Sequence, residues 1–249
     1  MKTIFLTLSI IAIAFSSCKK KESAEPVVSS TGGGSVVSGN YGVFISRKQA
    51  IITNTLVSNL SNFSTAFVSN TALIDNNPIV GSLVNMGDVT LNGTTFQHNG
   101  FGVANMYKDS TSLTYNTPLN WNVTGSGSVS SFSFSNTNPY PVYTGYSSIP
   151  DSFNISSNVS IPLVSYSGSD EIETYFISSG AAPISTSIQH ITGSPSSLNF
   201  TVSDLSIIGV ASNVSLAITF YKNNVQTING KQYNFRTGYL VIKSNLKFK

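Results

Sequence analysis

Cysteine, histidine and charge are scarce in this sequence, and each shortage excludes a class of site. Cys18 is the only cysteine among 249 residues, His98 and His190 are the only histidines, and 9% of the residues are charged. One thiol excludes an intrachain disulfide framework, and two histidines cannot complete a structural zinc site without carboxylates. The folded part must therefore be stabilised by its hydrophobic core, and no cofactor is expected.

Clustered positive charge is also lacking, although the formal net charge is +3. Lys19–Lys21 lie next to Glu22 and Glu25 in one short run near the amino terminus. Arg47–Lys48 is the only other pair of adjacent basic residues. A nucleic-acid-binding domain requires a clustered basic face or stripe, so the sequence argues against nucleic acid as a partner.

Hydroxyl and amide side chains are abundant instead, with 43 Ser, 23 Thr and 25 Asn. These side chains compete with the hydrogen bonds of a helix, so they disfavour a helical protein. The 15 Phe and 11 Tyr residues can fill a hydrophobic core, which argues against a disordered chain. The composition therefore predicts an all-β fold with a polar, weakly charged surface.

The amino terminus has the pattern of an export signal. Lys2 precedes an apolar run, Ile4–Phe15, that is too short to cross the ~30 Å hydrocarbon layer as a helix. Ser16 and Ser17 follow, and with Cys18 they resemble the lipobox of bacterial lipoproteins. That resemblance implies a signal peptide over residues 1–17, cleavage before Cys18, and lipid on the Cys18 thiol and amine.

Residues 18–40 have the composition of a flexible tether, rich in Ser and Gly, with a glycine triplet at Gly32–Gly34. Acyl chains such as palmitate on Cys18 would hold the protein on a membrane almost permanently. We therefore expect the membrane as a partner through the lipid anchor, and a location in the cell envelope at the outer membrane. The sequence leaves open whether the protein faces the periplasm or the cell surface.

From Tyr41 onward the dominant pattern is period-two alternation, which predicts strands. Asn92-Gly93 accepts the positive φ angles of a type I′ turn, so residues 88–96 are predicted to form a hairpin. Residues 52–63 fit a helical stripe but consist of poor helix formers, which favours a strand or irregular segment. One helical turn is expected over 203–206, with Ser203 or Asp204 as its cap. Further strands are expected at 131–135, 159–164, 171–176, 198–202, 214–220 and 232–248, the last as one or two strands.

About a dozen strands exceed a seven-stranded domain of about 100 residues. The fold class is therefore an immunoglobulin-like or related antiparallel β-sandwich, either one enlarged sandwich or two β units. A change in composition near Trp121 suggests an N-terminal β region over 41–120 and a C-terminal β-sandwich region over 121–249.

A family resemblance rests on several short motifs in the second half of the chain. They are Trp121-Asn122-Val123, Ser131-Phe132-Ser133-Phe134, Asn138-Pro139-Tyr140-Pro141, Ile149-Pro150 and Gly230-Lys231-Gln232-Tyr233-Asn234-Phe235. In these motifs the chain resembles a group of uncharacterised lipoproteins from Bacteroidetes-type bacteria, over roughly residues 89–242. The resemblance implies a β-sandwich body on a lipid anchor and brings no activity or functional residues with it.

The sequence contains few groups that could perform catalysis. It has no nucleophile elbow, no zinc-protease helix motif and no phosphate-binding loop, so we expect a protein that is not an enzyme. The one acidic cluster, Asp170, Glu171 and Glu173, could supply part of a calcium site. The alternative is a solvated strand end. His98 is expected in a surface loop after the hairpin.

Tyrosines provide the clearest indication of binding. Tyr140, Tyr143 and Tyr146 lie in a segment marked by proline and glycine, hence in a predicted loop. Exposed flat aromatic rings bind sugar rings or partner proteins. The alternative is that this loop folds back over the core. The sequence thus favours a non-catalytic binding or adhesive module for a glycan or an envelope protein, and as a second hypothesis a structural envelope component that assembles through strand edges.

Overall fold

The computed structural model describes residues 40–53, 56–73, 76, 81–109, 115–178 and 185–249. The predicted signal peptide, Cys18 and almost the whole tether lie outside the described residues. Within the described residues no helix is both long and apolar enough to cross a membrane.

The fold is built around one large sheet with the strand order β14-β13-β16-β18-β1-β2-β6-β5. Neighbouring strands on this path are antiparallel, except that β1 and β18 run parallel from Asn40↔Gln232 to Thr53↔Ser244. Strands β10 and β17 also pair with β18. The bounds are β1 (Asn40–Thr53), β2 (Leu56–Val68), β5 (Gln97–His98), β6 (Tyr107–Lys108), β10 (Ser152–Phe153), β13 (Glu171–Ser178), β14 (Ser185–Thr192), β16 (Ala211–Lys222), β17 (Val225–Ile228) and β18 (Lys231–Phe248).

Three smaller sheets accompany the large one. One has the order β4-β3-β7-β8, and the others are the pairs β11–β15 and β12–β9. Their strands are β3 (Val89–Leu91), β4 (Thr94–Thr95), β7 (Leu119–Val123), β8 (Phe132–Asn136), β9 (Val142–Tyr143), β11 (Val159–Pro162), β12 (Tyr166–Ser167) and β15 (Ser197–Phe200). In the part of the chain that the structure describes, the short helices are η1 (Gly100–Gly102), η2 (Tyr146–Ser148) and α2 (Val202–Ser206). The prediction of an all-β sandwich is confirmed, with the parallel pairs β1–β18 and β10–β18 as departures from a purely antiparallel arrangement.

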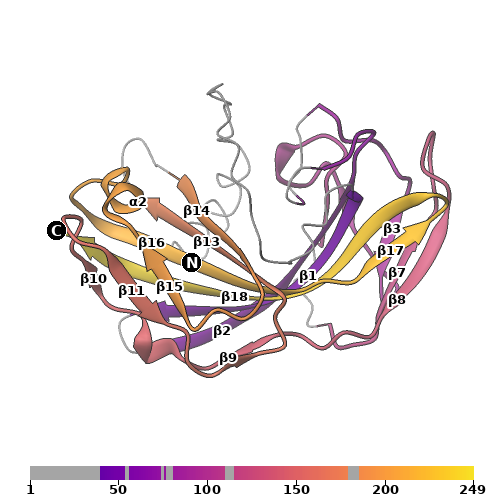
Figure 1. Cartoon of the computed structure of the whole chain (residues 1–249). Helices are drawn as coiled ribbons and strands as arrows, with labels where there is room; N and C mark the ends of the chain where they lie inside the picture. Colours follow the sequence, from indigo (N-terminus) through magenta and orange to yellow (C-terminus); the bar gives the residue numbers. More distant parts are fainter. Residues whose placement is uncertain (1–39, 54–55, 74–75, 77–80, 110–114, 179–184) are drawn as a thin grey trace, which may run out of the picture.

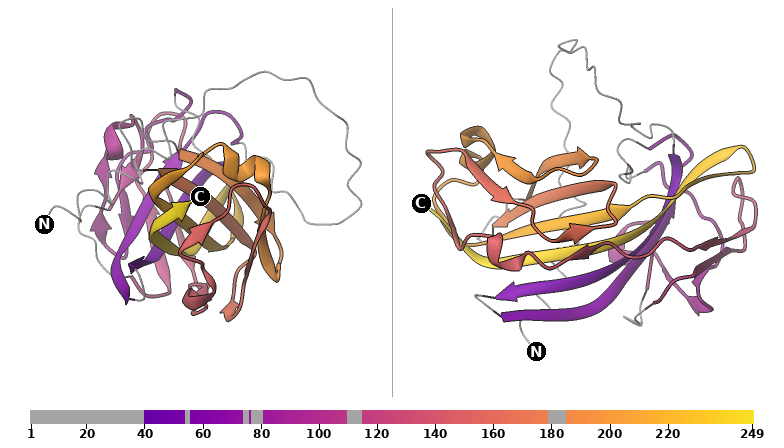
Figure 2. Two further views of the ribbon diagram at one scale, coloured as in Figure 1. Left: turned by 90° about the vertical axis from the view of Figure 1, so that its left-hand side faces the viewer. Right: turned by 60° about the horizontal axis from the view of Figure 1, so that its bottom comes forward.

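Of the four hydrophobic clusters among the described residues, the two largest form cores at opposite ends of the long strands. Figure 1 shows α2, β10, β11 and β15 at one end and β3, β7, β8 and β17 at the other, with β1 and β18 running between them. Figure 2 shows the same strands from two further sides. The α2-end core contains Phe153, Phe176, Phe200 and Phe248, and the β7-end core contains Phe44, Trp121 and Phe235.

The expected boundary at residue 121 does not separate two units. It falls inside β7, which pairs with β3 on one side and β8 on the other. Strand β1 from the first region pairs along its length with β18 from the second. The two regions share one sheet because the last strand of the chain returns to lie beside the first.

Several local predictions are confirmed. Asn92 and Gly93 have φ angles of 47° and 82° and connect β3 to β4, as a type I′ turn requires. Residues 52–63 belong to strands, apart from 54 and 55, which lie outside the described residues, and 232–248 belongs to the single strand β18. The helical turn exists as α2, but its cap was predicted wrongly. Thr201 is the cap, and Asp204 accepts from its backbone N–H at 2.8 Å in a capping box.

Candidate functional site

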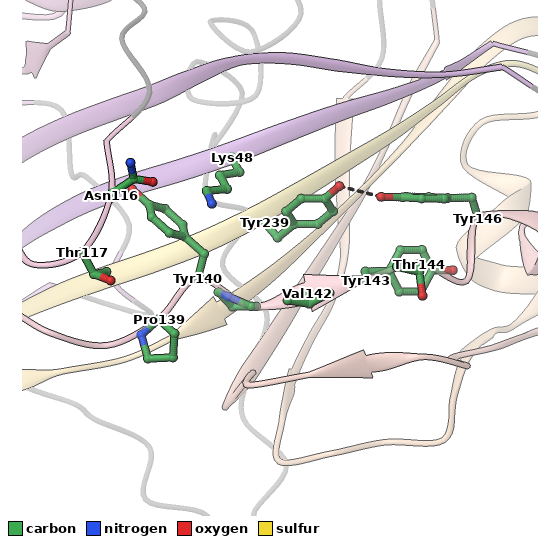
Figure 3. Close-up of a pocket in the computed structure, with 11 residues that line it drawn as sticks. Lys48, Asn116, Thr117, Pro139, Tyr140, Val142, Tyr143, Thr144, Tyr146 and Tyr239 are labelled. Carbon is green, nitrogen blue, oxygen red and sulfur yellow. Dashed lines mark hydrogen bonds between the residues drawn. The ribbon is translucent and has the colours of Figure 1, made fainter.

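A groove of about 470 Å³ lies on the face of the large sheet that carries both cores. Four tyrosines line it, Tyr140, Tyr143, Tyr146 and Tyr239, together with Lys48 and polar groups of Asn116 and Thr117. Figure 3 shows Lys48 beside Tyr140, and the hydroxyl groups of Tyr146 and Tyr239 pointing toward each other. The sequence-predicted tyrosine segment therefore forms one wall of a groove.

The long strands and the segment 139–146 position these side chains. Lys48 and Tyr239 are register partners on β1 and β18, so their side chains emerge side by side on the same face. The segment 139–146 crosses from one core to the other. Tyr140 belongs to the β7-end core, and Tyr143 belongs to the α2-end core, where its ring stacks on Phe220 at 4.9 Å.

The four tyrosine side chains differ in solvent exposure, and therefore in how much ring surface a ligand could contact. Tyr140 and Tyr143 are 9% and 1% exposed, so the expectation of exposed rings is wrong for these two. Both rings pack into the hydrophobic cores, and each hydroxyl group has a hydrogen-bond partner within the protein. The Tyr140 hydroxyl lies 2.7 Å from Ser46 Oγ, and the Tyr143 hydroxyl donates to the Gly145 carbonyl at 2.6 Å. Tyr146 is half-buried, as is Tyr239, and their hydroxyl oxygens are 2.5 Å apart.

Among the described residues that line the groove, Lys48 is the one whose side chain is ionised at neutral pH, and it contributes a positive charge. Its ammonium lies 4.6 Å from the centroid of the Tyr140 ring, in a cation–π contact. Burial raises the pKa of Tyr140 to about 12, despite the hydrogen bond with Ser46 that lowers it. Burial also raises the pKa of Tyr143 and of Tyr239, so these hydroxyls stay neutral.

A second cluster of polar groups lies on the opposite face of the sheet, around the acidic run of β13. Glu171 and Glu173 share one strand face as expected, but they are 3% and 7% exposed. The interpretation as a solvated strand end is therefore wrong. The cause is Arg236 on β18, whose guanidinium lies 3.5 Å from the Tyr221 ring centroid and pairs with both carboxylates.

His190 and Asn223 complete the environment of Glu171. His190 Nε2 lies 2.7 Å from Glu171 Oε1, and Asn223 Nδ2 donates to Oε2 at 2.8 Å. Burial by itself raises the pKa of Glu171, but Arg236, His190 and Asn223 outweigh it and lower the pKa to about 2. Burial raises the pKa of Glu173 and outweighs the opposing effect of Arg236.

The expected calcium ligands are not brought together. Asp170 turns away to Lys222 Nζ at 2.6 Å and to the Asn223 backbone N–H at 3.0 Å. His190 takes its place, because ligand atoms of Glu171, Glu173 and His190 lie within 4.8 Å of one another. The Arg236 guanidinium pairs with both carboxylates, so it offsets part of their negative charge and would oppose a cation bound between them.

Comparisons with protein-family models, with curated proteins and with solved structures find no match to this chain.

Sequence reasoning missed the residues that complete both clusters. Arg236 and His190 lie 65 and 19 positions from Glu171 along the chain, and Tyr239 lies 93 positions from Tyr146. The pair Arg47–Lys48 is evident in the sequence, but nothing local to it indicates that Lys48 lines a groove. His98 is exposed as predicted, but it lies in strand β5 and not in a loop, and its ring stacks on Tyr107 of β6 at 4.7 Å.

Gly145 is predicted to be essential for the shape of the groove. A Cβ at this position would lie 2.4 Å from the Val164 carbonyl oxygen and 3.0 Å from the Tyr143 ring. Gly145→Ala is therefore expected to lower the free energy of unfolding by about 1–3 kcal/mol, measured by urea denaturation. Thr144→Ala, at an exposed neighbouring position, is the control and should stay within about 0.5 kcal/mol of the wild type. Equal stability of the two variants would contradict the close packing of this segment.

Proposed function

We propose that this protein is a non-catalytic binding module of the cell envelope, held at a membrane by lipid on Cys18, and that it binds a glycan in the tyrosine groove. The observation that supports the proposal is the combination of aromatic and polar groups in one concave site. Sugar rings present apolar faces that pack on aromatic rings and hydroxyl groups that need hydrogen-bond partners.

The dimensions and chemistry of the groove agree with this class of ligand. A volume of about 470 Å³ lies within the range of about 300–1,000 Å³ for small-ligand sites. Tyr146 and Tyr239 are partly accessible and supply ring surface. Lys48 and Thr117, half-buried, and exposed Asn116 can exchange hydrogen bonds with sugar hydroxyls.

A second candidate is assembly with partner subunits through a strand edge. Within the described residues, β14 is the last strand of the large sheet and its outer edge has no neighbour. An unpaired edge is a template for strand addition. Recovery of an envelope protein crosslinked to β14, with no glycan bound by the groove, would favour this candidate.

A glycan array tests the proposal with four proteins. The purified wild type is expected to bind at least one glycan class. Tyr146→Ala should bind that class about tenfold more weakly, equivalent to about 1.4 kcal/mol, because it removes ring surface. Tyr146→Phe keeps the ring and should retain most of the binding.

Tyr41→Ala is the matched control, since Tyr41 is also half-buried but does not line the groove. Its binding should equal that of the wild type. An array on which the wild type binds nothing, or on which Tyr146→Ala binds as well as Tyr41→Ala, would overturn the proposal.

A further inference from the structure

Arg47 occupies an unusual position on the face of the sheet opposite the groove. Its register partner on β18 is Gly238, and Arg47 Cγ lies 2.8 Å from where a Cβ of that glycine would stand. The missing side chain lets Arg47 lie across β18 toward β16. There its Nη1 donates to the Tyr221 hydroxyl at 3.2 Å, and its Cζ lies 4.8 Å from the Phe63 ring centroid.

The charge of Arg47 is buried but not balanced. The residue is 7% exposed, and within the described residues no carboxylate forms an ion pair with it. Arg236, on the same face, forms ion pairs with both Glu171 and Glu173. A buried charge without a counter-charge is strongly unfavourable, so buried arginines are nearly always paired.

The free donors of Arg47 have a defined geometry. Its Nε and Nη2 are buried and have no hydrogen-bond partner. These two nitrogens form one edge of the guanidinium and present two parallel N–H groups. That edge matches two oxygens of one carboxylate, phosphate or sulfate group, which arginine binds in a bidentate manner.

We propose that the Nε–Nη2 edge of Arg47 binds an oxyanion group of a small ligand, at a site separate from the tyrosine groove. The Phe63 ring lies beside the guanidinium, and the Tyr221 hydroxyl accepts a hydrogen bond from Nη1. The Arg236 guanidinium lies over the Tyr221 ring, but its charge is offset by Glu171 and Glu173, so it does not supply Arg47 with a counter-charge. Arg47 and Lys48 are consecutive on β1, so their side chains lie on opposite faces of the sheet.

Calorimetric titration of the purified protein with sodium phosphate, sodium sulfate or sodium acetate at constant ionic strength tests this proposal. At least one of these anions should bind saturably with one site per chain and raise Tm as its concentration increases. The anion that binds most tightly distinguishes a carboxylate ligand from a phosphate or sulfate ligand. Arg47→Gln should weaken this binding at least tenfold, whereas Lys247→Gln, which removes an exposed charge, should not change it.

A second measurement keeps the test valid if one variant is unstable. In anion-free buffer, Arg47→Met should have a Tm equal to or above that of the wild type, because an unpaired buried charge has been removed. Binding that is absent from the wild type, or unchanged in Arg47→Gln, would overturn the proposal. A large drop in Tm for Arg47→Met in anion-free buffer would also overturn it, because it would assign Arg47 a structural partner within the chain.

Discussion

Replacing Arg236 by methionine is expected to lower the free energy of unfolding by about 3–5 kcal/mol at pH 7, the cost of breaking a buried ion pair from one side. Arg236 is 2% exposed and pairs with the carboxylates of Glu171 and Glu173. Methionine fills much of the same space but removes the guanidinium that pairs with both buried carboxylates, so that His190 remains beside Glu171 alone. Urea unfolding of the two proteins at neutral pH measures the loss.

The loss should shrink as the pH falls. The pKa of Glu171 is about 2 in the folded protein, because Arg236, His190 and Asn223 outweigh burial, against an ordinary value of 4.5. A carboxyl group with a lowered folded-state pKa contributes stability that is complete above its unfolded pKa and is lost as the pH falls through the folded value. The variant lacks this contribution, so its stability should approach that of the wild type between about pH 4.5 and pH 2.

Lys222→Met is the matched control for this experiment. Lys222 pairs with Asp170 at 2.6 Å, but the two side chains are 35% and 39% exposed. Solvent screens such a pair, so its removal should cost at most about 1 kcal/mol. Similar small losses in both variants would contradict a buried ion cluster on β13.

Phe44→Ala is expected to lower the free energy of unfolding by about 3–5 kcal/mol, the usual cost of removing a fully buried aromatic side chain. Phe44 is 0% exposed and lies on β1. Its ring stacks on Phe235 of β18 at 4.9 Å and meets Trp121 of β7 edge to face at 5.3 Å. The substitution therefore loosens the contact between the large sheet and the sheet that contains β7.

Phe44→Leu provides the comparison, because it keeps an apolar group of similar size and should cost less than about 1.5 kcal/mol. Both variants should unfold in one transition, since β1 and β18 belong to both cores. A second transition in Phe44→Ala, confined to the β7 end, would show that the two cores unfold independently.

The sequence predicted the strands well because alternation is a local property. Phe132 and Phe134 share one side of β8, and the Asn92-Gly93 turn needs only its own two residues to adopt positive φ angles. The cap of α2 was misplaced by a few residues. Thr201 is the cap because its hydroxyl and the carboxylate of Asp204 each accept a hydrogen bond from the other residue's backbone N–H.

The pairing of β1 with β18 could not be predicted from local patterns. Nothing in residues 40–53 specifies that the neighbour will come from residues 231–248, or that it will run parallel. Separation along the chain also explains why the partners of the acidic cluster could not be predicted, because Arg236 lies 65 positions from Glu171. Ser167-Gly168-Ser169 before Glu171 suggested a solvated end, whereas Arg236, from the far end of the chain, determines that Glu171 is buried.

The sequence of the tyrosine segment left two alternatives open, exposed rings that bind a ligand or a loop that folds over the core, and the structure contains both. Tyr140 and Tyr143 fold back into the cores, and Tyr146 remains partly accessible beside Tyr239. Tyr140 and Tyr143 anchor this segment in the two cores directly before Tyr146, and this packing holds the wall of the groove in place. Rigid aromatic walls reduce the ordering cost of binding, which supports a pre-formed site for a ligand.

The most direct test of the proposed groove is the acetylation rate of Lys48, measured by mass spectrometry with and without a saturating glycan from the array. Lys48 lies over Tyr140 inside the groove, and Lys231 lies over Tyr41 outside it at 5.5 Å, so Lys231 is an internal reference with a similar environment. We expect the glycan to slow acetylation of Lys48 at least fivefold and to leave Lys231 unchanged. An unchanged rate at Lys48 under saturation would contradict a ligand site in the tyrosine groove.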